Sequence, residues 1–221
     1  MTIIEAIGQR HAVRQYLDKS LQGDVLTALQ DEVRECNAES GLNIQLIVGD
    51  SGIFGNFLAK YGKFSGVQNC VVLIGEKKDG LDEKAGYYGA RITLKAQQLG
   101  LNTCWAALTF SRKKCAEMVG KGEKIVCAIA LGYGATQGVQ HKSRPMESLY
   151  KADGEMPDWF RSGIEAAILA PTALNQQKFL FTLLGSTVKA EATGGVNSKV
   201  DLGIVKYHFE AGAGTENFKW A

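Results

Sequence analysis

The stretch Ala170-Pro171-Thr172-Ala173-Leu174-Asn175-Gln176-Gln177 separates an apolar, helix-like segment from a strand-like one. Pro171 must end the helix before it, because proline disfavours helical geometry in the preceding residue. The residues after it are apolar or polar, end in three consecutive carboxamides and carry no charge. Such a loop suits contact with a flat heterocycle, with backbone against the ring face and carboxamides at the polar ring edges. A helix stop followed by a strand start would explain the same residues without any ligand.

The segments on both sides of this loop predict a mixture of helices and strands. Hydrophobic periodicity predicts helices at residues 2–8, 24–39, 83–99, 111–119, 157–170 and 200–213. Apolar runs predict strands at residues 42–48, 70–75, 103–108, 125–131 and 178–184. Asp24 is an N-cap candidate and Gly100 a C-terminal cap. Residues 135–155 are polar, and we expect them to be irregular.

A degenerate repeat links the two ends of the chain. Leu42-Asn43-Ile44-Gln45 opens the first strand, and Leu174-Asn175-Gln176-Gln177 opens the last. Gly86 is followed by Gly100 and Trp105, as Gly203 is followed by Gly214 and Trp220. Chance similarity between two helix–strand–helix units is the alternative, but we interpret the match as a diverged duplication. The chain is then one α+β domain over 1–221, made of halves at about 1–140 and 156–221 that pack on each other.

The bulk composition is that of a soluble globular enzyme. In 221 residues, 45% are hydrophobic and 22% charged, and the formal net charge is only +2. This balance gives no reason to expect a nucleic-acid partner, and no apolar run is long enough to span a membrane. The amino terminus carries an acid and no basic segment, unlike a signal peptide. The five cysteines are odd in number and form no Cys-x-x-Cys pair, so we expect free thiols and a cytoplasmic location.

Two basic clusters stand apart from this balanced background. The first, residues 9–16, holds Arg10 and Arg14 with apolar Val13 between them. Two arginines so spaced can face the same side and hold a phosphate through charge-assisted hydrogen bonds. The second is His141-Lys142-Ser143-Arg144-Pro145. Taken alone, each would more often be a solvated turn or loop.

Together and in this order, these segments resemble the nitroreductase family of FMN proteins. Its Arg-x-Ser-x-Arg-x-Tyr/Phe element is similar to residues 10–16, and its Ala-Pro-Ser-x-x-Asn-x-Gln element to residues 170–177. Its Gly…Ala-x-x-Leu-Gly-Leu-x-x-x-Trp helix and strand resemble residues 86–105. Its Gly-Tyr-Pro and Lys-x-Arg ending resembles residues 131–135 and 142–145. The resemblance covers nearly the whole chain and rests on four motifs in series.

The resemblance implies a nitroreductase-like fold and an FMN cofactor, with NAD(P)H as co-substrate. It implies a ping-pong transfer of electrons to a nitroaromatic, quinone or similar small acceptor, with no metal and no catalytic side chain, because the cofactor carries the chemistry. Arg10, Arg14, Lys142 and Arg144 would neutralise the phosphate. The remaining cofactor-binding candidates are His11, Ala12, Lys63, Ala106, Ala107, Pro171, Thr172, Ala173 and Asn175.

The order of the motifs departs from the family pattern. Ordinary members are intertwined homodimers and carry the Pro-Ser-x-x-Asn element soon after the arginines, whereas here that slot holds residues 36–43 without a proline. We therefore expect a single-chain pseudo-dimer with one flavin site, for which a monomer is possible and a homodimer also compatible. Ala12 replaces the usual serine, and Lys178-Phe179 replaces the common Pro-Trp.

The same scaffold serves several reactions, so the fold does not fix the chemistry. A flavin-binding or regulatory module without efficient turnover is the alternative from another class, and other reactions of the superfamily are a third. The acceptor itself is not encoded in any motif of the chain.

Overall fold

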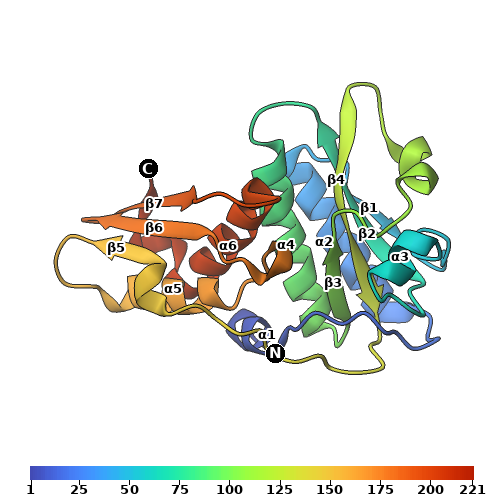
Figure 1. The fold of residues 1–221 in the computed structure, drawn as a ribbon, viewed down its shortest axis with the longest axis horizontal. Coiled ribbons are helices and arrows are strands. Elements are labelled where there is room, and N and C mark those ends of the chain that lie inside the picture. The colour runs from blue at the N-terminus through green and yellow to red at the C-terminus, as the bar shows by residue number, and fades with distance from the viewer. The chain divides into compact units, whose positions relative to one another are not determined.

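The computed structural model describes residues 1–221, and the chain divides into two compact units (Figure 1). The first, here the N-sheet unit, comprises Gln9–Leu81 and Ile92–Gln140. The second, the C-sheet unit, comprises Met1–Gly8, Asp82–Arg91 and His141–Ala221. These units do not follow the order of the expected halves, because one end of the chain and part of a central helix group with the C-terminal residues.

A four-stranded antiparallel sheet forms the centre of the N-sheet unit. Its strand order is β1-β2-β4-β3, and every neighbouring pair is antiparallel. The strands are β1 (Gln45–Ile47), β2 (Asn69–Glu76), β3 (Asn102–Ala106) and β4 (Glu123–Gly132). In β2 the side chains of Cys70, Val72 and Ile74 alternate with those of Val71 and Leu73, and all five are buried. The continuous apolar run thus makes a strand covered on both faces, as predicted.

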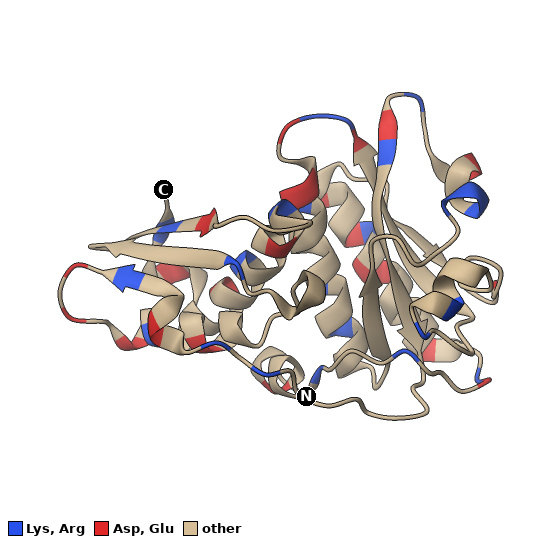
Figure 2. Ribbon diagram, in the orientation of Figure 1, with Lys and Arg blue, Asp and Glu red and all other residues tan.

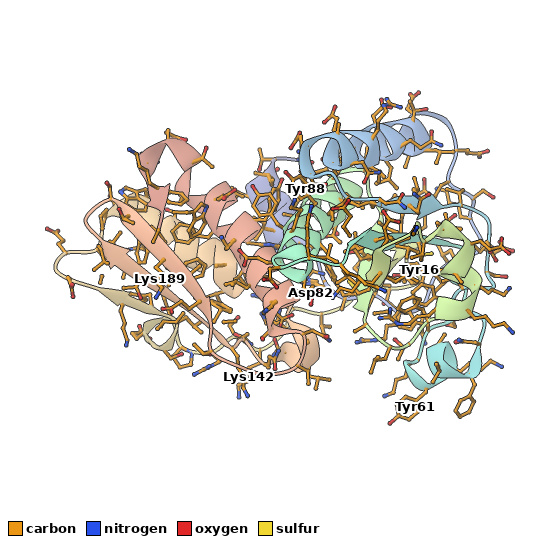
Figure 3. All side chains as sticks on the ribbon, turned by 90° about the horizontal axis from the view of Figure 1, so that it is seen from above. Tyr16, Tyr61, Asp82, Tyr88, Lys142 and Lys189 are labelled. Carbon is orange, nitrogen blue, oxygen red and sulfur yellow. The ribbon has the colours of Figure 1, made fainter.

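Helices cover both faces of this sheet. Figure 1 places α2 (Gly23–Ser40) on one face and the short α3 (Phe57–Tyr61) on the other. The core on the α3 side joins Phe54, Phe64 and Phe110 to the sheet. The part of α4 (Leu81–Gln98) after Arg91 and the 3-10 helix η1 (Arg112–Met118) complete the unit. Figure 3 shows the side chain of Tyr61 projecting away from α3.

A second four-stranded sheet organises the C-sheet unit, in the order β5-β6-β7-β8. Its strands are β5 (Tyr150–Ala152), β6 (Phe179–Leu184), β7 (Thr187–Ala192) and β8 (Lys219–Trp220). The β6–β7 pair is antiparallel, whereas the two outer pairs are parallel. The rings of Phe181 and Phe209 stack with centroids 4.7 Å apart, and Phe160 packs edge-on against Phe209. These aromatic side chains attach the helices to the sheet.

The helices of the C-sheet unit are α5, α6, α1 and the first part of α4. Helix α1 spans Ile3–Gln9, with Gln9 in the other unit, α5 spans Asp158–Ile168 and α6 spans Ser198–Ala213. The unit also contains the 3-10 turns η2 (Met146–Ser148), η3 (Ala173–Asn175) and η4 (Thr215–Asn217). A Cβ on Gly86 of α4 would lie 2.0 Å from the carbonyl oxygen of Val200. A Cβ on Gly203 of α6 would lie 1.9 Å from the carbonyl oxygen of Glu83. Each helix therefore uses a glycine to admit the backbone of the other.

The expected α+β class and most of the expected elements are confirmed, but several short elements differ from the expectation, among them the helix α3, which was not predicted. Residues 135–155 are not wholly irregular, because β5 pairs in parallel with β6. Two strands were not expected: β7, which follows β6 through the two-residue turn Gly185-Ser186, and β8, which has two residues. Asp24 is not the N-cap of α2, which begins at Gly23 after an extended Gln22. Gly100 does follow α4 with φ of 77°, as its predicted cap role requires.

We expect Gly203→Ala to lower the free energy of unfolding by about 3 kcal/mol, since overpacking against rigid backbone forces the helices apart. Chemical denaturation of the purified chain measures the change. Gly8→Ala is the matched control, because a Cβ there would meet nothing within 4 Å in α1. It should be neutral or stabilising by about 0.5–1 kcal/mol. Equal stability for Gly203→Ala and the unchanged chain would contradict the close helix crossing.

Candidate functional site

The arginine segment, residues 10–16, is an extended strap bound to the N-sheet unit. Val13 N–H donates to the Thr103 carbonyl at 3.1 Å, which adds the strap beside β3. Arg14 and Tyr16 are fixed through Ser65, whose N–H donates to the Arg14 carbonyl and whose carbonyl accepts from the Tyr16 N–H, both at 3.0 Å. The Tyr16 hydroxyl donates back to the Val13 carbonyl at 2.7 Å. The backbone of the segment is therefore immobilised before any ligand arrives.

Arg10 is a buried cation without a counter-ion in the protein. Its side chain is 4% exposed, and neither Nε nor Nη1 has a hydrogen-bond partner. Burial lowers the pKa of Arg10 to about 10, so the guanidinium is still charged at neutral pH. Gln97, Thr103 and Trp105 of the same unit also bury a polar atom without a partner, but each is uncharged. A buried charge costs far more than a buried neutral group unless an anion compensates it.

Arg14 is exposed, yet its charge acts on the same side chain as that of Arg10. Burial raises the pKa of the Cys104 thiol, and Arg14 and Arg10 both oppose that rise. Both guanidinium charges therefore act on the Cys104 thiol in β3. Between them, Ala12 is exposed and His11 is half-buried.

The other predicted residues of the N-sheet unit lie near the ends of its elements. Lys63 is exposed and has φ of 62° just after α3, two residues before the Ser65 that binds the arginine segment. Ala106 is buried at the end of β3, opposite Ala128. The carbonyl of Ala107 accepts from Arg112 Nη2 at 3.1 Å, so this part of its backbone is already engaged.

In the C-sheet unit, the basic loop (residues 141–145) and the amide loop (residues 171–177) form one assembly held by Gln177. Gln177 Oε1 accepts from the Arg144 N–H at 2.8 Å, and its Nε2 donates to the Lys142 carbonyl at 3.0 Å. Arg144 Nη1 donates to the Gln177 carbonyl at 3.2 Å. The Gln177 side chain is 1% exposed, so a buried carboxamide joins two loops that are 33 residues apart.

Side chains of the amide loop also serve this assembly. Asn175 Nδ2 donates to the Lys142 carbonyl at 2.9 Å, and its Oδ1 accepts from Gln177 Nε2 at 2.9 Å. The Thr172 hydroxyl accepts from the Gln177 N–H at 3.0 Å. Pro171 and Ala173 are half-exposed, whereas Lys142 and Arg144 are exposed. Figure 3 shows Lys142 at the edge of its unit, with its side chain directed away from the ribbon. Two cations are thus held beside a rigid amide surface.

The predicted residues divide between the two units. Arg10, His11, Ala12, Arg14, Lys63, Ala106 and Ala107 belong to the N-sheet unit, and Lys142, Arg144, Pro171, Thr172, Ala173 and Asn175 belong to the C-sheet unit. Figure 2 shows acidic and basic residues interspersed along the elements of both units, so the unpaired burial of Arg10 is a local feature rather than part of a basic surface.

Sequence reasoning missed two side chains that organise the site. Gln177 belongs to the Ala-Pro-Ser-x-x-Asn-x-Gln-like motif, which predicts no role for its side chain, although its carboxamide connects the two loops. Asp201 carried no local signal, because it lies in the first turn of α6 and reaches the amide loop only in three dimensions. Two histidines contact backbone carbonyls: His141 Nε2 lies 3.0 Å from the Ile168 oxygen, and His208 Nδ1 lies 2.9 Å from the Ile204 oxygen.

No group of three or more His, Cys, Asp and Glu side chains is placed to hold a metal ion. None of the helices combines the length and the apolar composition that crossing a bilayer requires. All five cysteines are free and buried.

Comparison with solved structures defines the fold as that of the nitroreductases. A "putative nitroreductase" from Thermotoga maritima aligns with a TM-score of 0.69 at 24% identity, covering 96% of this chain and 83% of that one. A "putative nitroreductase in complex with FMN" from Desulfovibrio desulfuricans aligns with a TM-score of 0.55 at 18% identity, covering 70% and 98%. A "putative NADH dehydrogenase/NAD(P)H nitroreductase" from Bacteroides thetaiotaomicron aligns with a TM-score of 0.51 at 17% identity, covering 66% and 95%.

The family follows from the sequence model that fits the chain. The family described as "Putative TM nitroreductase" matches residues 2–213. The protein therefore belongs to this nitroreductase family of oxidoreductases, as the motifs predicted. A search among proteins of curated function found no match.

We expect Gln177→Glu to lower the free energy of unfolding by about 3 kcal/mol at neutral pH, because a buried carboxylate oxygen would face the acceptors of Lys142 and Asn175. The loss should shrink at acidic pH, where a protonated carboxyl can donate again. Denaturant unfolding over a pH series measures both effects. Gln30→Glu is the matched control, since Gln30 is exposed on α2. A loss that did not depend on pH would contradict the donor role of Nε2.

Proposed function

We propose that the protein binds one FMN and passes electrons from NAD(P)H to a nitroaromatic, quinone or similar small acceptor. The observation that carries this proposal is Arg10, a cation kept almost out of water without an anion. An FMN phosphate is a dianionic group of the kind that would compensate it. Membership of a nitroreductase family supports the choice of ligand, as does the relative that was solved with FMN.

Within each unit, the residues present fit such a cofactor by charge and by hydrogen-bonding chemistry. Arg10 and Arg14 would hold the phosphate from the arginine segment, and Lys142 and Arg144 from the basic loop. His11, Ala12 and Lys63 would contact the polar parts of the cofactor. Pro171, Thr172, Ala173 and Asn175 would lie along the ring and ribityl chain, and the backbone at Ala106 and Ala107 would approach the ring nitrogens.

These residues assign binding and orientation to the protein and the redox chemistry to the cofactor. When bound, FMN supplies the hydride and electron chemistry. The arginines bind the phosphate, the amide loop orients the ring, and the exposed cations remain available to anionic groups. Because one surface would serve donor and acceptor in turn, we propose a ping-pong sequence. The name of the Bacteroides relative supports a nicotinamide donor.

We also propose that the chain is an internally duplicated pseudo-dimer with a single flavin site. Gly86 admits the backbone of α6, and Gly203 admits the backbone of α4. Such reciprocal contacts are what a two-fold axis produces, where residue i meets j and j meets i. Each glycine is the sixth residue of its helix, and each helix is followed by a glycine and then a strand that bears a tryptophan. Because a duplicated chain carries both the arginine segment and the amide loop, we propose that a monomer suffices. Five free thiols suit a cytoplasmic location.

Arg10→Met should weaken FMN binding at least tenfold while leaving the ligand-free protein as stable as before, or more so. The lost charge-assisted contact is worth about 1.4 kcal/mol or more, and removal of an unpaired buried cation relieves its desolvation cost. Fluorescence titration with FMN measures the first effect, and denaturant unfolding without FMN the second. Arg14→Ala should also weaken FMN about tenfold. Arg34→Met, at an exposed position of α2, should change neither quantity. Unchanged FMN affinity in Arg10→Met would remove the phosphate role.

The full chain reconstituted with FMN should be yellow, and NADH or NADPH should bleach it without oxygen. A nitroaromatic or quinone should then restore the colour, which is measured by anaerobic visible spectroscopy. A yellow protein that neither nicotinamide bleaches would contradict the proposed electron donor and favour a binding module. A chain that takes up no FMN would refute the proposed function itself.

A further inference from the structure

The amide loop concentrates unusual backbone geometry. Leu174, Asn175 and Gln177 have φ of 52°, 53° and 46°, and the rest of the chain has only two other non-glycine residues with positive φ, Lys63 and Asn197. Left-handed backbone is unfavourable for residues with a Cβ, most clearly for a bulky one such as leucine. Leu174 is also 90% exposed, so folding gains no apolar burial in return. The surrounding structure must therefore impose this conformation.

Asp201 of α6 supplies the constraint. Its Oδ1 and Oδ2 accept from the Ala173 N–H at 2.9 and 3.1 Å, and its Oδ2 accepts from Gln176 Nε2 at 2.7 Å. Ala173 and Gln176 flank the two left-handed residues, so one carboxylate accepts hydrogen bonds from both ends of the turn. Gln176 Nε2 donates as well to the Val196 carbonyl at 2.7 Å, which anchors the far end of this contact. Asp201 is 5% exposed, so water competes little for these bonds.

We propose that Asp201 is a positioning residue for flavin binding: it holds Leu174 and Asn175 in left-handed backbone and so fixes the surface that the amide loop offers to the flavin ring. In this arrangement the unpartnered side chain of Leu174 supplies an apolar contact for the flat ring face. The inference rests on the proposed function, because it names residues that prepare the same FMN site.

A carboxylate suits this role better than an amide. Asparagine would offer one acceptor oxygen and turn its own N–H groups toward the Ala173 and Gln176 donors. Burial raises the pKa of Asp201, although the bonds from Gln176 and Ala173 oppose the rise. With its pKa above the unfolded value, the ionised group lowers stability at neutral pH, and that stability returns as the pH falls through the folded pKa toward the unfolded one.

The first test replaces Asp201 with Asn in the full chain and compares it with Asp158→Asn. Asp158 is exposed in the first turn of α5, so the control makes the same chemical change at a similar helical position of the same unit. Asp201→Asn should weaken FMN at least tenfold and change the visible circular dichroism of bound FMN. Asp158→Asn should do neither. An Asp201→Asn protein that folds and binds FMN with unchanged affinity and dichroism would overturn the inference and leave the proposed function standing.

A second variant exchanges the hydrogen-bond donor and acceptor between positions 201 and 176. In the double variant Asp201→Asn with Gln176→Glu, the introduced amide N–H can donate to the introduced carboxylate while the amide oxygen accepts from the Ala173 N–H, and the net charge is unchanged. Since the introduced carboxylate cannot donate to the Val196 carbonyl, we expect only part of the lost FMN affinity to return. A double variant as weak as, or weaker than, Asp201→Asn alone would count against a donor–acceptor clamp.

Leu174→Gly tests the presented side chain without removing the clamp. Glycine accepts left-handed backbone, so the melting temperature of the ligand-free protein should stay the same or rise. FMN affinity should nevertheless fall about fivefold, because the apolar contact is lost and the loop is less ordered. Unchanged affinity would overturn the Leu174 contact even if Asp201→Asn failed to fold. Absence of FMN binding by the unchanged chain is a different result, which refutes the proposed function.

Discussion

The proposed site depends on one constraint: the guanidinium of Arg10 is buried without a counter-ion. Arg10 is held there by a strap whose backbone is bound to β3 and Ser65, so the side chain does not reach water by a simple shift of the segment. Solvation would favour exposure of this charge, and the fold keeps it buried with two nitrogens unbonded. An anionic ligand resolves that conflict more directly than any protein group in the structure does.

In the C-sheet unit, the residues of the proposed binding surface lie on loops. Loops are mobile unless their polar groups are satisfied from several directions. Here Gln177 ties the basic loop to the amide loop, and Asp201 ties the amide loop to α6. A buried carboxamide and a buried carboxylate thus give two irregular segments the rigidity of regular structure. These contacts also hold the strained turn at Leu174, which belongs to the proposed binding surface.

Close packing of the α4 and α6 backbones connects the helix crossing to the position of Asp201. Gly86 and Gly203 lie at corresponding places in α4 and α6, and each leaves room for the other helix. A side chain at either position would separate the helices and move the first turn of α6, which carries Asp201. Packing in the C-sheet unit is in this way coupled to the geometry of the amide loop.

Much of the fold could be predicted because its signals are local. Apolar periodicity located α2, α4 and α6, the buried run located β2, and Pro171 located the end of α5. Several short elements were not predicted, even where the sequence contains a local signal for them. The Gly185-Ser186 turn marks the β6–β7 hairpin, and Asn56 caps α3 through a bond from the Ala59 N–H. Only β5 and β8 lack such a signal, because parallel pairing of two or three residues depends on the partner strand alone.

The sequence by itself determined the family, the class of fold and the residue types that a phosphate and a flat ring would require. Those follow from spacing and chemistry along the chain. The tertiary structure alone decided that Arg10 is buried while Arg14 is exposed, and that Gln177 and Asp201 organise the loops. Burial and hydrogen bonding between residues some 30 positions apart depend on how distant segments pack, and no local pattern records that packing.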